Sequence, residues 1–430
     1  MKRTFAVLLA VFAVTGALFA QEVTMSGELK TGLYMEQETI GNKDPVAKGG
    51  MTNNDGDSGS AEGRLRLDLD SSYGNMGLRV RFQIEPTGLG PFRPSWGYAY
   101  AYGHLFDEQL TISAGLLGDS PWGTGGPKLR SDPESREYIA YNDLSGDPYT
   151  ASEGLMGIRF EYKPSFVPGL NVGFVLNQPD QVAIDTKEQT FGDVLGESVI
   201  GVAYRNDYFS VRVGYRFDSK ADAYSKNSKT WDEGGRLTYR LEERVLDNLV
   251  EGMKIWLNGD YYGIGCEQVD LQTGAGTIKV GSGEYFLNWL YWLWDTDNFI
   301  AKLDAGFGVY KSYSNDTFRP TKRQEYQSLE VLPGFYYKLF DNLLQIGLGI
   351  GFGIEMGTGK TYKDSPYQYL SIEPMIRLNL GPNAYVAGVY TYTDKYTWWN
   401  KDAWMSIPDG IKEGDKSVKH AINIRAVYTF

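Results

Sequence analysis

Hydrophobic and polar residues alternate with a period of two along most of the chain. Between Arg64 and Asp70, leucines at the odd positions alternate with charged residues at the even positions. The same alternation returns from Leu78 to Glu85, after the turn-like segment 71–75. Because successive side chains of a strand point to opposite faces, the pattern predicts strands with one apolar and one polar face. These two segments therefore form a predicted hairpin.

About 18 segments of this kind can be counted, and helical spacing is absent from the clearest of them. They lie near residues 22–37, 61–71, 75–85, 95–105, 109–118, 153–163, 170–178, 197–206, 208–219, 230–243, 249–262, 277–294, 298–312, 323–339, 342–356, 366–380, 383–394 and 417–430. Short links alternate with long ones, which is typical of a barrel that crosses an outer membrane. We therefore predict an all-β fold: a closed antiparallel transmembrane β-barrel of about 18 strands, or 16 as the alternative, with short periplasmic turns and long external loops.

Composition agrees with strands and turns. The 430 residues include 52 Gly and 31 Tyr, both far above average usage, and 42% of the residues are hydrophobic. After the N-terminal segment, no stretch reaches the roughly 18 uninterrupted apolar residues that a membrane helix needs. A membrane protein built from helices is thereby excluded.

The first residues have the features of a secretory signal peptide. Lys2 and Arg3 precede an apolar stretch, and small residues precede position 21. We expect residues 1–20 to be the signal peptide and 21–430 the barrel. Removing residues 1–20 lowers the Lys+Arg count from 42 to 40 against 54 acidic residues, so the net charge changes from −12 to −14 and nucleic acid is an unexpected partner. Cys266 is the only cysteine, which excludes an intrachain disulfide.

The two faces of the strands predict where function lies. The apolar face should meet lipid, and the polar face should point into the interior. Aromatic residues near strand ends, such as Tyr98, Tyr100, Tyr102 and Trp289, are expected in an outward interfacial girdle, and His104 is expected to share that face. Arginine is frequent on the polar face of the first ten strands. The candidate pore-lining residues are Arg64, Arg66, Arg79, Arg81, Arg159, Arg212, Arg216, Arg236, Asp304 and Glu373.

The final strand carries the most specific signal. Its apolar face includes Ile422, Ile424 and Tyr428, and the sequence ends on Phe430. This resembles the C-terminal strand of bacterial outer-membrane β-barrel proteins and, within that class, porins of about 18 strands. The resemblance implies location in the outer membrane, contact with its lipid, recognition of the strand ending in Phe430 by the barrel-assembly machinery, and passive diffusion of small hydrophilic solutes. It also implies a possible homotrimer.

The longest link, residues 119–152, is a candidate for narrowing the channel. It is rich in acidic residues, proline and aromatic side chains, and is too long for a simple tether. An open barrel of 18 strands needs something inside it to narrow the channel. A loop lying over the mouth or against a neighbouring subunit is the alternative. The candidate constriction residues are Asp119, Trp122, Lys128, Arg130, Asp132 and Glu134.

Catalytic chemistry has little support in the sequence. The two histidines, His104 and His420, are both expected at outward interfacial positions, so neither is placed for a triad or a zinc site. The acidic segment 54–59 lacks the carboxylate spacing of a calcium loop. We therefore expect no enzyme activity, no metal site and no cofactor. The alternatives to a porin are a non-conducting surface barrel that acts as an adhesin or scaffold, a fatty-acid-type transporter of hydrophobic solutes, and, last, a barrel hydrolase using one of the histidines.

Overall fold

The computed structural model describes most of the strands and the short links between them. The expected signal peptide lies outside the described residues. These are 22–50, 64–86, 92–117, 122, 156–177, 195, 198–217, 230–269, 277–314, 323–357, 367–396 and 416–430.

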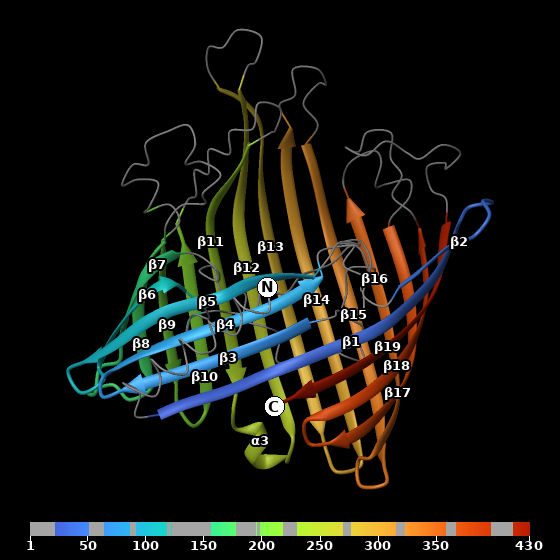
Figure 1. Cartoon of the computed structure of the whole chain (residues 1–430). Coiled ribbons are helices and arrows are strands. Elements are labelled where there is room, and N and C mark those ends of the chain that lie inside the picture. The colour runs from blue at the N-terminus through green and yellow to red at the C-terminus, as the bar shows by residue number, and fades with distance from the viewer. Residues whose placement is uncertain are drawn as a thin grey trace.

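Nineteen antiparallel strands form a single sheet (Figure 1). Their bounds are β1 (Glu22–Ile40), β2 (Val46–Gly50), β3 (Arg64–Tyr73), β4 (Met76–Pro86), β5 (Phe92–Leu105), β6 (Leu110–Leu116), β7 (Met156–Tyr162), β8 (Leu170–Asn177), β9 (Val199–Arg205), β10 (Phe209–Arg216), β11 (Thr230–Glu243), β12 (Met253–Val269), β13 (Thr277–Asp295), β14 (Phe299–Ser314), β15 (Arg323–Leu339), β16 (Leu344–Gly357), β17 (Tyr367–Gly381), β18 (Ala384–Tyr396) and β19 (Lys416–Thr429). A short helix, α3 (Leu246–Leu249), joins β11 to β12. No helix within the described residues is long and apolar enough to span a membrane.

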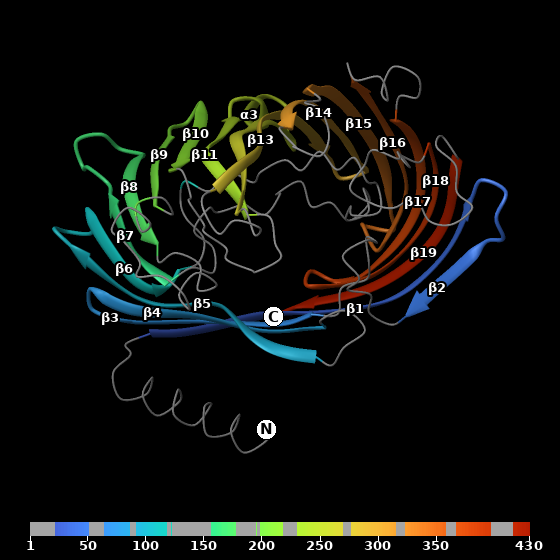
Figure 2. The same cartoon turned by 90° about the horizontal axis from the view of Figure 1, so that it is seen from above.

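The sheet closes on itself through β1 and β19. Their register runs from Glu28 opposite Thr429 to Ile40 opposite Ser417. β2 and β3 pair with different stretches of the other edge of β1, so together they occupy one position. Every other strand pairs with its neighbour in sequence, and the result is a closed antiparallel barrel with 18 strand positions, seen as a ring in Figure 2. The predicted fold and strand count are confirmed.

Short links gather at one rim of the barrel. Two residues join β3 to β4 and β17 to β18, and three join β9 to β10 and β13 to β14. β1 begins and β19 ends at this rim, because Glu22 is opposite Ser72 and Thr429 is opposite Glu28. The predicted alternation of short and long links thus matches the strand bounds. The short strand β2 and the helix α3 were not predicted, since neither carries an amphipathic pattern of its own.

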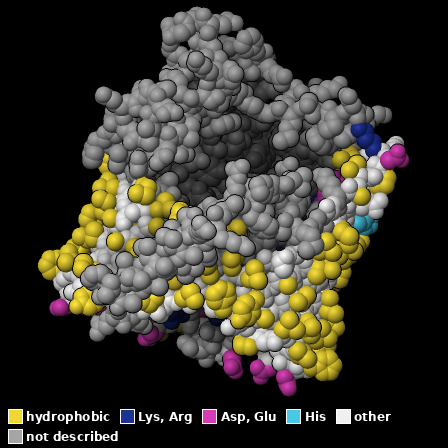
Figure 3. Space-filling model, viewed as in Figure 1, with side chains coloured by type: hydrophobic (Ala, Val, Ile, Leu, Met, Phe, Trp, Pro, Cys, Tyr) yellow, Lys and Arg dark blue, Asp and Glu magenta, His cyan; other side chains and the backbone are white. Residues whose placement is uncertain are grey.

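The outer face of the barrel is an apolar surface (Figure 3). On β16, Leu348 and Ile350 are 43% and 38% exposed, whereas Gly349 between them is buried. Other exposed apolar side chains of this face are Met25, Leu29, Ile158, Phe160, Ile200, Val202, Leu290, Phe307, Phe335, Tyr337, Ile346, Phe352, Ile372, Ile376, Ile422 and Ile424. An exposed apolar surface this extensive marks a face that contacts something other than water.

Several glycines of the sheet make room for aromatic rings. A Cβ at Gly347 would lie 1.9 Å from the ring of Tyr336, one at Gly259 2.0 Å from Tyr239, and one at Gly77 2.2 Å from Tyr102. Each ring therefore lies directly over the glycine backbone of a nearby strand. Part of the glycine excess in the composition has this physical cause, since any side chain at these positions would displace the ring.

Candidate functional site

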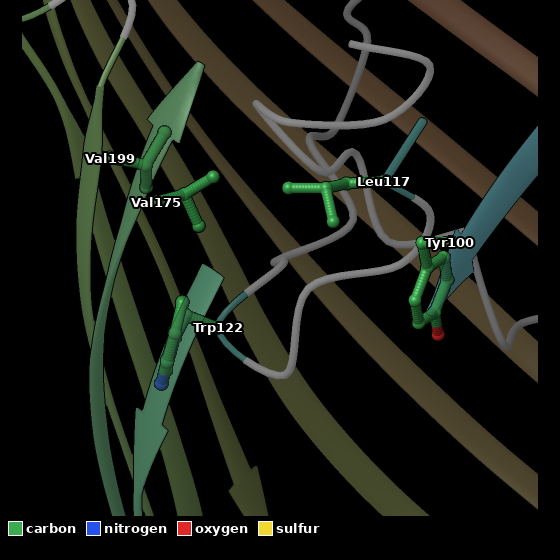
Figure 4. Packing of buried hydrophobic residues seen from close by; sticks show 5 residues of the cluster. All are labelled: Tyr100, Leu117, Trp122, Val175 and Val199. Atoms are coloured by element: carbon green, nitrogen blue, oxygen red, sulfur yellow. The ribbon is translucent and has the colours of Figure 1, made fainter. Parts of the chain in front are cut away.

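The inner face of the barrel is identified by contacts between strands that are not neighbours. Tyr100 of β5, Val175 of β8 and Val199 of β9 belong to one buried cluster together with Leu117 and Trp122 (Figure 4). β5 and β8 are separated by two strands, so only a concave face can bring their side chains to a common centre. The cross-strand registers extend this face around the ring.

The ten candidate pore-lining residues all occupy strand positions that face inward. The structure describes the side chains of seven of them. The backbone positions of the other three fit the same ladders, with Arg64 opposite Lys30 and Arg216 opposite Arg236. Their side chains lie outside the described part. The seven described residues are Arg66, Arg79, Arg81, Arg159, Arg212, Asp304 and Glu373.

Two arginine–aspartate pairs connect β3 to β4 on this face. Asp68 is directly opposite Arg81, and the arginine donates to it from Nε at 2.6 Å and from Nη2 at 3.4 Å. Asp70 is directly opposite Arg79, whose Nε donates to it at 2.6 Å. Charges of opposite sign attract when they face each other across an antiparallel pair. The alternation of the two strands puts Asp and Arg at such facing positions.

Tyrosines of β5 complete the two pairs. The Tyr98 hydroxyl donates to Asp68 at 2.9 Å, and the guanidinium of Arg81 lies 4.6 Å from the centre of the Tyr98 ring. The Tyr102 hydroxyl donates to Asp70 at 3.3 Å. The result is a row of carboxylate, guanidinium and phenol groups across three strands.

The position of these tyrosines corrects a prediction. The register between β4 and β5 shifts between the pairs Arg81–Tyr98 and Phe82–Trp96, so Gly97 is an extra residue. Trp96 stays on the outer face, where it packs edge-on against Phe82 at 5.5 Å. After the bulge, Tyr98, Tyr100, Tyr102 and His104 turn to the inner face, because one inserted residue reverses every later side chain. The predicted outward placement of these four residues was wrong.

Trp289 also departs from the predicted outer girdle. It is buried on the inner face beside Leu332, with Tyr291 against it, whereas Trp292 and Trp294 keep the register of the outer face. Trp256 stacks on Tyr291 at 5.2 Å. Because side chains alternate along a strand, the odd-numbered Trp289 and Tyr291 point inward and the even-numbered Trp292 and Trp294 point outward. The prediction that placed Trp289 in the outer girdle was therefore wrong.

β7 and β11 carry more enclosed arginines. Arg159 lies 2.7 Å from Glu161, and both side chains are buried. Arg212 is directly opposite Arg240, whose guanidinium lies 5.4 Å from the Trp256 ring and 3.6 Å from Glu242.

The inner face of β13–β19 and β1 holds charged side chains that are almost completely enclosed. Lys419 lies 2.5 Å from Glu36 across the closing seam. Ser371 donates to Glu373 at 3.3 Å. The other enclosed charged residues are Lys302, Asp304, Glu330 and Arg425.

Trp122 occupies a socket in the inner wall. It is 1% exposed, and its ring would be 2.1 Å from a Cβ at Gly173 and 2.2 Å from one at Gly201. These glycines are opposite each other on β8 and β9. No larger residue would leave room for the indole, so the inner wall accepts this side chain at this position. The other candidate constriction residues, Asp119, Lys128, Arg130, Asp132 and Glu134, lie outside the described residues.

The two histidines have different surroundings. His104 Nδ1 lies 2.9 Å from the Thr111 hydroxyl on the inner face. His420 is on the outer face, as predicted, with its Nδ1 2.7 Å from the Tyr390 hydroxyl. Among the residues that the structure describes, no group of three or more His, Cys, Asp or Glu side chains could hold a metal ion.

Comparison with known proteins gives structural neighbours alone. No protein-family model matches the chain, and no curated protein matches it. A loop-deletion mutant of OmpT, an outer membrane protein of Vibrio cholerae, is 12% identical, with 95% of this chain and 99% of that chain covered and a TM-score of 0.46. The outer membrane channel DcaP of Acinetobacter baumannii is 11% identical, with 95% and 97% covered and a TM-score of 0.46.

An anion-selective porin from Comamonas acidovorans is also similar, at 12% identity, with 95% of this chain and 99% of that chain covered and a TM-score of 0.47. The structural neighbours are therefore outer-membrane proteins and channels, and they identify no subfamily. The barrel assignment rests on the strand pairing of this chain itself.

Proposed function

We propose that this protein is an outer-membrane porin, a passive diffusion channel for small hydrophilic solutes. The observation that carries the proposal is the division of the closed sheet into an exposed apolar outer face and an inner face of charged and polar groups. In lipid every backbone N–H and C=O group must be satisfied within the protein, and a closed barrel does this. A barrel with 18 strand positions is also in the size range that leaves an aqueous interior.

The two rims support an orientation in the membrane. Short turns, with the start of β1 and the end of β19, belong on the periplasmic side, and the long links belong outside the cell. The signal peptide at residues 1–20 supplies export, and the strand that ends at Phe430 supplies the contact with the assembly machinery. A homotrimer belongs to the same proposal.

The segment 119–152 narrows the channel in this proposal. Support comes from its described neighbour Leu117 and from Trp122, both enclosed in the inner-wall cluster with Tyr100, Val175 and Val199. A chain that passes through two anchoring points on the inner wall reduces the space available to solutes. Deleting residues 122–146 should raise the single-channel conductance, and an unchanged conductance would place the segment outside the barrel.

Planar-bilayer recording tests the function directly. Purified full-length protein should give stable conductance steps, and liposomes containing it should swell in small sugars and amino acids with a size cut-off. Repeated silence from folded protein would favour the scaffold alternative, and entry of a single sugar class would replace a general porin by a specific channel. The proposal concerns passive transport alone and assigns no catalytic role to either histidine.

A further inference from the structure

The charged groups of the β3–β4 wall differ in how far they reach the interior space. The side chain of Arg79 is 52% exposed, against 31% for its partner Asp70. The neighbouring pair is more enclosed, with Arg81 at 17% and Asp68 at 24%. In the Arg79–Asp70 pair the guanidinium is therefore more exposed than the carboxylate, so the positive end of this pair faces solvent.

Arg79 also keeps hydrogen-bond donors that its described partners do not use. A guanidinium has five N–H donors. Asp70 accepts from Nε, and the Tyr100 side chain is the other hydrogen-bond partner among the described residues. Arg81, by contrast, gives both Nε and Nη2 to Asp68 and has the Tyr98 ring at 4.6 Å. Because Arg79 is 52% exposed and Arg81 only 17%, the remaining donors of Arg79 are the better placed of the two sets to meet a solute.

The location of Arg79 gives these donors a role. Arg79 is directly opposite Tyr100, and Tyr100 belongs to the buried cluster that holds Leu117 and Trp122. Arg79 therefore lies beside the point where the segment after β6 is anchored to the inner wall. If that segment narrows the channel, a passing solute must come close to this guanidinium.

We infer that Arg79 is the contact for an oxyanion group, a carboxylate or a phosphate, on solutes that cross the barrel. The inference rests on the proposed channel function and names the class of solute that the channel favours. The planar fork of an arginine side chain matches the two oxygens of such a group. The charge of Asp70 stays with Nε and the Tyr102 hydroxyl, so it does not occupy the outward donors.

Block of the chloride current by inorganic phosphate or by acetate tests this role. Each anion is added in separate planar-bilayer recordings of the full-length protein at about 0.1 M KCl, where the Debye length is about 10 Å. We expect at least one anion to reduce the wild-type current. Arg79→Gln should raise the half-blocking concentration about fivefold, the factor that corresponds to roughly 1 kcal/mol between unit charges about 4 Å apart in water. Arg79→Lys should keep part of the effect.

Arg81→Gln is the matched control, because it removes the same charge from the same face of β4, two residues further along the strand. Its half-blocking concentration should stay close to the wild-type value. Equal sensitivity of Arg79→Gln and wild type, or equal losses in Arg79→Gln and Arg81→Gln, would overturn the inference while leaving the channel intact. A wild-type protein that folds and never conducts would instead overturn the proposed function.

Discussion

The inner wall of β3–β5 and the inner wall of β13–β19 carry similar residue types in different environments. On the first, Arg79 and Asp70 are 52% and 31% exposed. On the second, Asp304 is fully enclosed, and Lys419 and Glu36 are 7% and 3% exposed. Alternation puts charges on the inner face of both walls. Their neighbours decide whether those charges face solutes or brace the wall.

Large aromatic side chains account for part of this difference. On the enclosed wall, Tyr336 lies over Gly347, and Lys302 approaches its ring at 5.7 Å. On the open wall, the rings of Tyr98 and Tyr102 lie beside the arginine–aspartate pairs without covering Arg79. The polar face of a barrel strand therefore identifies the residues that point inward, and only the exposed ones among them can act on a solute.

The largest expected effect is on the seam of the enclosed wall. Lys419→Met should lower the free energy of unfolding by about 3–5 kcal/mol, because it leaves Glu36 enclosed without its 2.5 Å partner. Arg79→Gln should cost at most about 1 kcal/mol, since exposed ion pairs contribute little. Urea titrations in lipid vesicles measure both values.

The double variant Glu36→Leu with Lys419→Met is the control for the seam. It should recover most of the lost stability, because an apolar pair of similar volume needs no desolvation of charge. Equal costs for Lys419→Met and Arg79→Gln would mean that the two walls are electrostatically alike, and the comparison would fail.

A second substitution tests the distinction between outer and inner faces. Leu348→Arg or Ile350→Arg should destabilise the barrel by about 2–4 kcal/mol near the membrane midplane, because the guanidinium would face hydrocarbon. Ser26→Arg is the inner-face control, since Ser26 is exposed and directly opposite Asp68. If both faces tolerated arginine equally in a folding titration, the outer face would not meet lipid.

The Trp122 socket on β8 and β9, which also contacts Tyr100 of the open wall through their shared cluster, supplies the third test. Gly201→Ala should cost about 1–3 kcal/mol through overpacking, because its Cβ would lie 2.2 Å from the indole. It should also raise the conductance if the indole leaves the wall. Gly388→Ala is the control, with its nearest neighbour at an ordinary 3.7 Å, and it should change neither stability nor conductance appreciably.

Much of the barrel follows from the sequence, because the alternation of a strand is a local property. The 18 predicted segments correspond to the 18 strand positions, and the faces of β7, β10, β16 and β19 agree with the pattern. The inner placement of Tyr98, Tyr100 and Tyr102 could not be predicted in this way. It depends on the bulge at Gly97, which is visible only in the pairing of β4 with β5.

The environment of each inner charge was equally hidden. Arg79 and Asp304 are both charged residues on polar faces, and no local pattern shows that one is open and the other enclosed. Asp304 lies directly opposite Tyr291 and Leu332 on the two neighbouring strands, so its enclosure depends on side chains that the pattern of β14 does not contain. The Trp122 socket likewise depends on Gly173 and Gly201, more than fifty residues further along the chain. Gly173 and Gly201 face each other on adjacent strands, but the sequence alone does not show that pairing.

The smallest expected effect concerns ion preference, and it separates the two walls by function. Changing Arg79, Arg81 and Arg212 together to Gln should shift the reversal potential in a KCl gradient toward cation preference, because all three charges lie on the inner face, on β4 and β10, and none of them is fully buried. The matched triple change, Asp304→Asn with Glu330→Gln and Glu373→Gln, should shift the reversal potential much less in the folded fraction. Asp304, Glu330 and Glu373 are 0%, 2% and 4% exposed, so their side chains are enclosed in the wall.

Salt dependence distinguishes this reading from a change in pore shape. A shift caused by wall charge should shrink as KCl rises toward 1 M, where the Debye length is only about 3 Å, whereas a change in pore shape would persist. An unchanged reversal potential in the arginine variant at low salt would make those residues braces of the wall. Equal and opposite shifts from the two triple variants would instead mean that enclosed carboxylates act on ions as strongly as exposed guanidinium groups, and exposure would then not decide which charges select the solute.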